Sequence, residues 1–211
     1  LFTESTRKES RAAALQMRKI AKRQTKHNQE VLVIHGLHLL VRFSNSEMLS
    51  WPNSPLLVML QFVDPNVLIG VEERETLLHH LANLADPFDY STHVNQLILA
   101  KQLIEHGADV NSVSIPEGVT PLHRACWSGV VTNLDFVELL LERGADPNAQ
   151  EYRGMIPLMS TIPDAPGAAK FLLNWPATDA NITSRSGASF LAVIRARIIT
   201  MLNRIALPVN T

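Results

Sequence analysis

The stretch GVTPLHRACWSGVVTNLDFVELLLERGADPNAQ, residues 118–150, decides the fold of this chain. Two of its elements occur earlier in the sequence. LERGADPNA at 141–149 matches IEHGADVNS at 104–112, and VTPLHRAC at 119–126 matches ETLLHHLA at 75–82. Because both elements recur in the same order, the stretch is one unit of an internal repeat.

The repeat continues more loosely after residue 150. MIPLMS at 155–160 and ATDAN at 177–181 follow the pattern of the two elements. GASFLAVI at 187–194 starts a fourth unit, with Ser189 placed 33 residues after Ile156. The sequence therefore predicts an array of stacked units rather than one irregular globule.

These units resemble the ankyrin repeat over residues 70–200. The family's T-P-L-H-x-A-A element is matched at Thr120, Pro121, Leu122, His123, Ala125 and, with Cys in place of Ala, Cys126. Its L-L-L-x-x-G-A-D-x-N element is matched at Leu139, Leu140, Leu141, Gly144, Ala145, Asp146 and Asn148. The resemblance implies an all-α fold, an α-solenoid of about three to four irregular repeats capped by N-terminal helices.

Local chemistry agrees with helices at these positions. A Thr120 hydroxyl can cap free backbone N–H groups, and Pro121 is tolerated in a first helical turn. Gly144 follows VELLLER, where a helix has to end and the backbone needs a positive φ. The resemblance implies that His123 hydrogen-bonds between turns and is structural.

Two units are longer than the family pattern. The spacing from Thr76 to Gly107 is 31 residues, and from Thr120 to Gly144 it is 24. We expect insertions near ADPFDYSTHV and VVTN, both between the helices of a unit, where extra chain costs little closure entropy. In the third unit, STIPDAPGAAKFLL predicts a short first helix because of its prolines and glycine.

The composition supports helices in a protein without membrane spans. Apolar residues make up 46% of the chain and aromatic residues only 6%, which favours helix packing over a β-sandwich. No apolar run reaches the roughly 18 residues of a membrane span. The single Cys126 excludes an intrachain disulfide and suits a reducing compartment, so we expect an intracellular protein, cytoplasmic or nuclear. The first residue is Leu, which suggests a piece of a longer chain.

Charge and composition divide the chain into three parts. Residues 1–30 are expected to form a basic helical arm, and residues 31–70 apolar capping helices or a decayed repeat. Residues 71–211 form the repeat domain, with units at about 72–113, 114–150, 151–183 and a partial unit at 184–211. The first 50 residues carry a net charge of +5, and the remainder carries −6.

The basic arm has three interpretations, which the sequence leaves open. It is a solvated helix leaning on the first repeat, a contact for nucleic acid or an anionic surface, or else a presequence remnant or a helix that binds a neighbouring subunit. The cations of the second interpretation are Arg18, Lys19, Lys22, Arg23 and Lys26.

Motifs for catalysis, metals and cofactors are absent from the sequence. His123, Cys126 and Asp135 have the residue types of a nucleophilic site, but repeat positions already explain the His and the Cys. The pairs His79 with His80 and His35 with His38 lack nearby carboxylate or Cys ligands. No phosphate-binding loop occurs. We therefore predict no catalytic residue, no metal, no cofactor and no enzyme activity.

The resemblance points instead to a partner-binding face made of hairpin tips and first helices. Its candidate contacts are Ile115, Glu117, Val119, Trp127, Ser128, Glu151, Tyr152, Arg153 and Arg185. Trp127 and Tyr152 are the candidate anchors, since exposed aromatics beside Arg form many binding hot spots. The alternative for Trp127 is packing on the VVTN insertion.

Asn111 and Asn148 occupy the position that asparagine hydroxylases modify in some ankyrin domains, and each has the alternative role of stabilising its hairpin.

The leading hypothesis is a non-enzymatic module that binds a partner protein. The alternatives are an accessory or regulatory subunit docked through the basic arm and residues 31–70, and nucleic-acid binding by the arm.

Overall fold

The structure is a computed structural model, and it describes residue 36 and residues 64–69, 74–83, 90–127, 134–161 and 166–196. Its helices are α5 (Leu77–Asn83), α6 (Tyr90–Glu105), α7 (Pro121–Trp127), α8 (Leu134–Glu142), α9 (Pro157–Ser160) and α10 (Pro166–Asn174). Residues 190–196 are also helical. These ranges contain no strand, only the isolated bridges Ile69–Glu75 and Arg74–Ile115.

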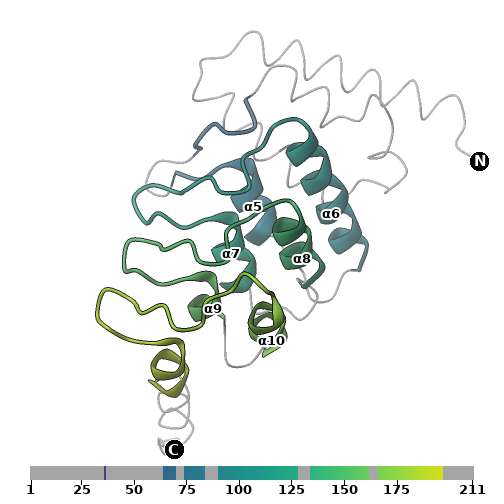
Figure 1. Cartoon of the computed structure of the whole chain (residues 1–211). Coiled ribbons are helices and arrows are strands. Elements are labelled where there is room, and N and C mark those ends of the chain that lie inside the picture. Colours follow the sequence, from purple (N-terminus) through teal and green to yellow (C-terminus); the bar gives the residue numbers. More distant parts are fainter. Residues whose placement is uncertain are drawn as a thin grey trace, which may run out of the picture.

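The helices stack in two columns (Figure 1). The short first helices α5, α7 and α9 lie one below another, and the second helices α6, α8 and α10 form the neighbouring column. Between successive units the chain projects to one side as a hairpin-like loop, beside the column of first helices. The all-α solenoid expected from the resemblance is thus confirmed.

The predicted helix boundaries follow from the backbone chemistry of the repeat. α7 begins directly after Thr120, whose Oγ1 accepts a hydrogen bond from the backbone N–H of His123 at 3.4 Å. The second helices α6 and α8 end just before Gly107 and Gly144, which have φ values of 90° and 88°. A side chain is strained at such angles, so glycine terminates both helices.

A single apolar core runs through the described units. Each helix contributes aliphatic or aromatic side chains that are completely buried: Leu77, Leu78 and Leu81 of α5, Leu99 and Leu103 of α6, Leu122 of α7, Phe136 and Leu140 of α8, Leu158 of α9 and Leu172 of α10. A solenoid unit cannot bury its apolar face alone, so each unit depends on its neighbours.

The lengths of the units confirm one expectation and correct another. α9 has only four residues, as its prolines predicted. The insertion expected as a loop near ADPFDYSTHV is partly helical, because α6 already begins at Tyr90 and reaches 16 residues. Residues 90–94 of this stretch thus belong to a helix that packs on α8, and residues 85–89 lie outside the described residues. The expected arm at 1–30 lies outside the described residues.

Side-chain amides of asparagine join each turn to the next. Asn111 donates from Nδ2 to the carbonyl of Gly144 at 2.9 Å and accepts from the amide of Asp146 at 2.8 Å. Asn148 does the same one unit later, with Ala177 at 2.7 Å and Asp179 at 2.8 Å. Asn111 and Asn148 therefore hold successive repeats together.

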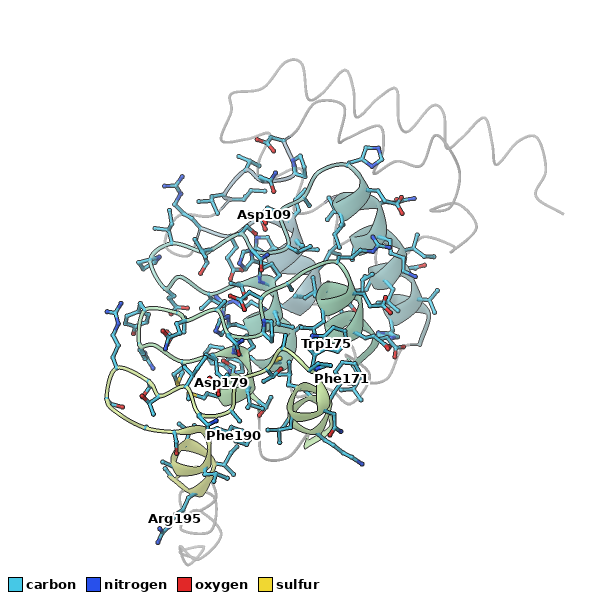
Figure 2. All side chains as sticks on the ribbon, viewed as in Figure 1. Asp109, Phe171, Trp175, Asp179, Phe190 and Arg195 are labelled. Carbon is cyan, nitrogen blue, oxygen red and sulfur yellow. The ribbon has the colours of Figure 1, made fainter. Side chains whose placement is uncertain are left out.

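The same pair of side-chain hydrogen bonds occurs at Asn66, inside the segment 31–70. Asn66 donates to the carbonyl of Gly107 at 2.9 Å and accepts from the amide of Asp109 at 2.7 Å. Asp109 and Asp179, the first and last amide donors of the series, are labelled at different levels of the stack in Figure 2. Asn66 thus occupies the position of Asn111 and Asn148, which places a repeat turn before the first predicted unit. Apart from residue 36, residues 31–63 lie outside the described residues.

Buried histidines form a second set of links. His79 Nδ1 bonds Thr76 Oγ1 at 2.8 Å, and its Nε2 bonds the carbonyl of Val119 in the next hairpin at 2.8 Å. His123 repeats this with Thr120 at 2.9 Å and the carbonyl of Met155 at 3.0 Å. Burial lowers the pKa of His79 to about 4 and also lowers that of His123.

Removing one of the asparagine side chains that join successive turns should destabilise the array. We expect Asn111→Ala to lower the free energy of unfolding by about 1–2 kcal/mol, because two hydrogen bonds between units are lost. Asn181 holds the equivalent position in the last described turn, where no such bond joins its side chain to a described residue, so Asn181→Ala should stay within about 0.5 kcal/mol of the parent. Urea denaturation measures the free energy of unfolding of both variants. Equal losses of stability would contradict the stabilising role of the Asn111 side-chain bonds.

The histidine links predict a pH dependence of stability. His79 resists protonation in the folded state, whereas it titrates near its usual pKa of 6.5 when unfolded, so stability is full above that value and falls as the pH drops toward 4. Between pH 7 and pH 5 this group should contribute a loss of about 2 kcal/mol. His79→Gln should flatten the pH dependence by that amount in urea titrations, and parallel curves would contradict this prediction.

Candidate partner-binding site

Residues from two neighbouring hairpins and α7 surround one pocket of about 140 Å³. Six of the predicted contacts line it: Glu117, Val119, Trp127, Glu151, Tyr152 and Arg153. His123, Met155 and Ser160 complete the lining, and the sequence analysis did not single them out for binding. The structure therefore brings most of the predicted face together at one place.

Exposed aromatics flank the pocket, each beside an arginine. Trp127 is 54% exposed and Tyr152 is 45% exposed. The guanidinium carbon of Arg124 lies 5.8 Å from the Trp127 ring centroid, and that of Arg153 lies 5.1 Å from the Tyr152 ring centroid. Both distances are in the range of cation–π attraction. The two rings thus expose large apolar surfaces whose positions are already restricted.

Arg153 is also bonded directly to its aromatic neighbour. Its Nε donates to the hydroxyl of Tyr152 at 2.7 Å, and this bond raises the pKa of the fully exposed Arg153. The hydroxyl accepts from a cation that remains charged at all physiological pH values. The Tyr152 ring and the Arg153 head group therefore form one amphipathic unit at the hairpin tip.

Arg124 links α7 to acidic residues of two units. Its Nε lies 2.5 Å from Oε1 of Glu75, and its Nη2 lies 3.6 Å from Oε2 of Glu117. The Arg124 and Glu75 side chains are only 12% and 8% exposed. Removing one partner of such a pair leaves an uncompensated charge, so the pair fixes the arginine beneath Trp127. No local sequence pattern signals this contact, because Glu75 and Arg124 belong to different units.

Two predicted contacts are buried and have structural roles. Val119 is 5% exposed, and its carbonyl accepts from Ser114 and bonds His79. Glu151 is 6% exposed, and its Oε1 accepts from the backbone amides of Arg153 at 2.9 Å and Met155 at 3.0 Å. They shape the hairpins and line the pocket, and a direct contact of either residue with a partner stays a prediction.

The remaining predicted contacts lie along the hairpin tips. Ile115 is 44% exposed and pairs with the backbone of Arg74, an exposed residue that the sequence analysis overlooked. Arg185 is exposed, and its amide donates to the carbonyl of Arg153 at 2.8 Å. Ser128 and the arm cations Arg18, Lys19, Lys22, Arg23 and Lys26 lie outside the described residues. The tips therefore follow one another as a continuous edge.

The asparagines considered for hydroxylation already have structural partners. Asn111 and Asn148 use both ends of their side-chain amides to hold the next turn. These bonds support the hairpin-stabilising role of both residues. Hydroxylation of either one stays a prediction.

The residues that resembled a nucleophilic site belong to the packing. Burial raises the pKa of the Cys126 thiol to about 12, so thiolate is negligible at neutral pH. Both ring nitrogens of His123 are hydrogen-bonded to the backbone or to Thr120. Across the described ranges, no group of three or more His, Cys, Asp or Glu side chains could hold a metal ion. None of the helices in those same ranges is long and apolar enough to cross a membrane.

Comparison with known proteins gives the family. A sequence model described as "Ankyrin repeats (3 copies)" matches residues 37–151. The chain is 38% identical over 63 residues to the potassium channel AKT3 of Oryza sativa subsp. japonica, and 41% identical over 63 residues to the 2-5A-dependent ribonuclease of Mus musculus. It is 38% identical over 71 residues to the B-cell lymphoma 3 protein homolog of Mus musculus.

These similarities cover 28–30% of this chain but only 7% of the channel, 8% of the ribonuclease and 15% of the B-cell lymphoma 3 homolog. The chain thus spans a small fraction of the relatives it matches. The family match includes part of the segment 31–70, in agreement with the repeat turn at Asn66. Since the matched model covers more than half of the residues and the described units stack as it requires, this chain belongs to the ankyrin-repeat family.

Proposed function

We propose that this chain is a binding module for a partner protein, and that contact is made through the hairpin tips and α7. The observation that carries the proposal is the pocket between Trp127 and Tyr152. Two large, exposed aromatic rings with restricted positions and adjacent arginines have the composition of an interface hot spot. Little side-chain entropy is lost when such rings become buried.

The rigidity of the stack supports the same function. Asparagine and histidine bonds fix the hairpins relative to each other, so the pocket exists before a partner arrives. The matched relatives include a channel and a ribonuclease by name. Proteins with such different names share only this repeat portion with the chain, which favours a recognition role over a common chemical activity.

The proposal is tested by affinity capture with the full chain as bait. We compare the wild type, the double variant Trp127→Ala with Tyr152→Ala, and the control Leu173→Ala, which removes a 48% exposed leucine from α10. Circular dichroism and thermal melting first establish that all baits are folded. We expect proteins held by the wild type and the control to be lost by at least tenfold with the double variant, since two anchors are removed.

Retention of the same proteins by the double variant would contradict the proposal. A further bait, with glutamine in place of Arg18, Lys19, Lys22, Arg23 and Lys26, separates the alternatives. Loss of all partners with this bait alone would assign binding to the basic arm. Treating each eluate with nuclease then distinguishes direct protein contacts from contacts bridged by nucleic acid.

A further inference from the structure

The exposed charges of the hairpin tips are unequal in sign. Arg74, Arg153 and Arg185 are exposed along this edge, and none of them forms a salt bridge with another described residue. The nearby carboxylates have internal partners: Arg124 contacts Glu75 and Glu117, and backbone amides bond Glu151. Among the described residues, the tips therefore present positive charge that no described carboxylate neutralises through a salt bridge.

The second helices and the turns of the described array carry exposed acids. Glu105, Asp135, Glu138 and Glu142 lie on α6 and α8, and Asp64, Asp109, Asp146 and Asp179 lie in turns. Exposed Lys101, Arg143 and Lys170 offset only part of this charge. An acidic ligand is therefore repelled by the second-helix side and attracted to the hairpin tips.

Backbone hydrogen bonds join the hairpins that carry the three tip arginines, and the hairpin of Ile115 and Glu117 lies between those of Arg74 and Arg153. Arg74 and Ile115 exchange two such bonds, at 2.8 and 3.0 Å. The amide of Tyr152 donates to the carbonyl of Glu117 at 2.9 Å, and that of Arg185 donates to the carbonyl of Arg153 at 2.8 Å. A ligand that contacts all three arginines has to cross the hairpins, which suits an extended segment.

The pocket adds an apolar site to this positive edge. Trp127, Tyr152 and Met155 supply its apolar lining, and its volume of about 140 Å³ suits one side chain rather than a helix. Glu117 lies at its border. A nucleic acid has a phosphate at every nucleotide and would place one of them near this carboxylate, whereas a peptide can carry its acids at separate positions.

We propose that the hairpin tips bind an extended acidic segment of a partner protein, with one apolar or aromatic side chain in the pocket between Trp127 and Tyr152 and carboxylates on Arg153, Arg185 and Arg74. This inference rests on the proposed function and specifies its ligand. Arginine forms planar, bidentate bonds with carboxylates, so each contact selects for Asp or Glu. The arginines of the tips set the preference for acidic residues in the bound segment. The pocket sets which residue of that segment aligns with which hairpin.

The test is selection from a random-peptide display library, with the folded full chain as the target. We compare the wild type, Arg153→Glu with Arg185→Glu, the control Lys170→Glu on α10, and Trp127→Ala with Tyr152→Ala. The wild type and the Lys170→Glu control should enrich acidic peptides with one apolar residue. The double arginine variant should enrich neutral or basic peptides instead, because the sign of the edge is reversed.

Affinities of one enriched peptide, measured by fluorescence anisotropy, complete the test. Arg185→Ala should weaken binding about threefold, as for an exposed ion pair, and added salt should weaken it further. Lys170→Ala should leave the affinity unchanged. A single-stranded oligonucleotide of similar length is the comparison ligand, and tighter binding of this oligonucleotide at the same tips would overturn the proposal.

Other outcomes separate this inference from the proposed function. Enriched peptides that are neutral or basic, yet lost with Trp127→Ala and Tyr152→Ala, would overturn the acidic ligand and leave the protein-binding pocket in place. Peptide enrichment that is unchanged with Trp127→Ala and Tyr152→Ala would overturn both the acidic ligand and the protein-binding pocket. No enrichment above an unrelated target would overturn the acidic segment, while the capture experiment still tests the binding function.

Discussion

The asparagine side chains of the turns carry the constraint on which the rest of the structure depends. Asn66, Asn111 and Asn148 each fix the backbone of the following turn by donating to one peptide group and accepting from another. A shift of one unit relative to the next would break both bonds together. Apolar packing alone tolerates small sliding motions, whereas this pair of directional bonds selects one register.

The histidines connect this register to the hairpins and first helices that line the pocket. Each ring joins the start of a first helix to the hairpin of the next unit, so the pocket lining and the helix column move together. Met159 replaces this histidine in the third unit, where it is completely buried and packs in the core. There the polar link is absent and apolar contact takes its place, at the end of the array where the resemblance to the family weakens.

The sequence predicted those features that depend on local backbone chemistry. Gly107 and Gly144 end helices because the chain needs a positive φ there, and the Thr-Pro pair at Thr120 begins one. It also predicted that Trp127 and Tyr152 would be exposed beside arginines. These assignments succeed because each follows from a few neighbouring residues.

Features that depend on packing between units were harder to predict. Val119 and Glu151 have the types and positions of surface contacts, but which side of a hairpin faces the next unit is decided by the stack. The ion pair of Arg124 with Glu75 joins residues from two units, so no local pattern reveals it. One signal was overlooked: Asp64, Pro65 and Asn66 repeat the tripeptide at 146–148 and so indicated a turn in the segment 31–70.

Directional bonds between turns hold the hairpin tips in place, and amide hydrogen exchange followed by NMR tests this most directly. The amides of Asp109, Asp146 and Asp179 belong to residues exposed at the surface, yet each donates to an asparagine of the preceding turn. The account predicts that these amides exchange only through opening of the array, with protection close to the global free energy of unfolding. Exchange at the rate of unprotected surface amides would contradict it.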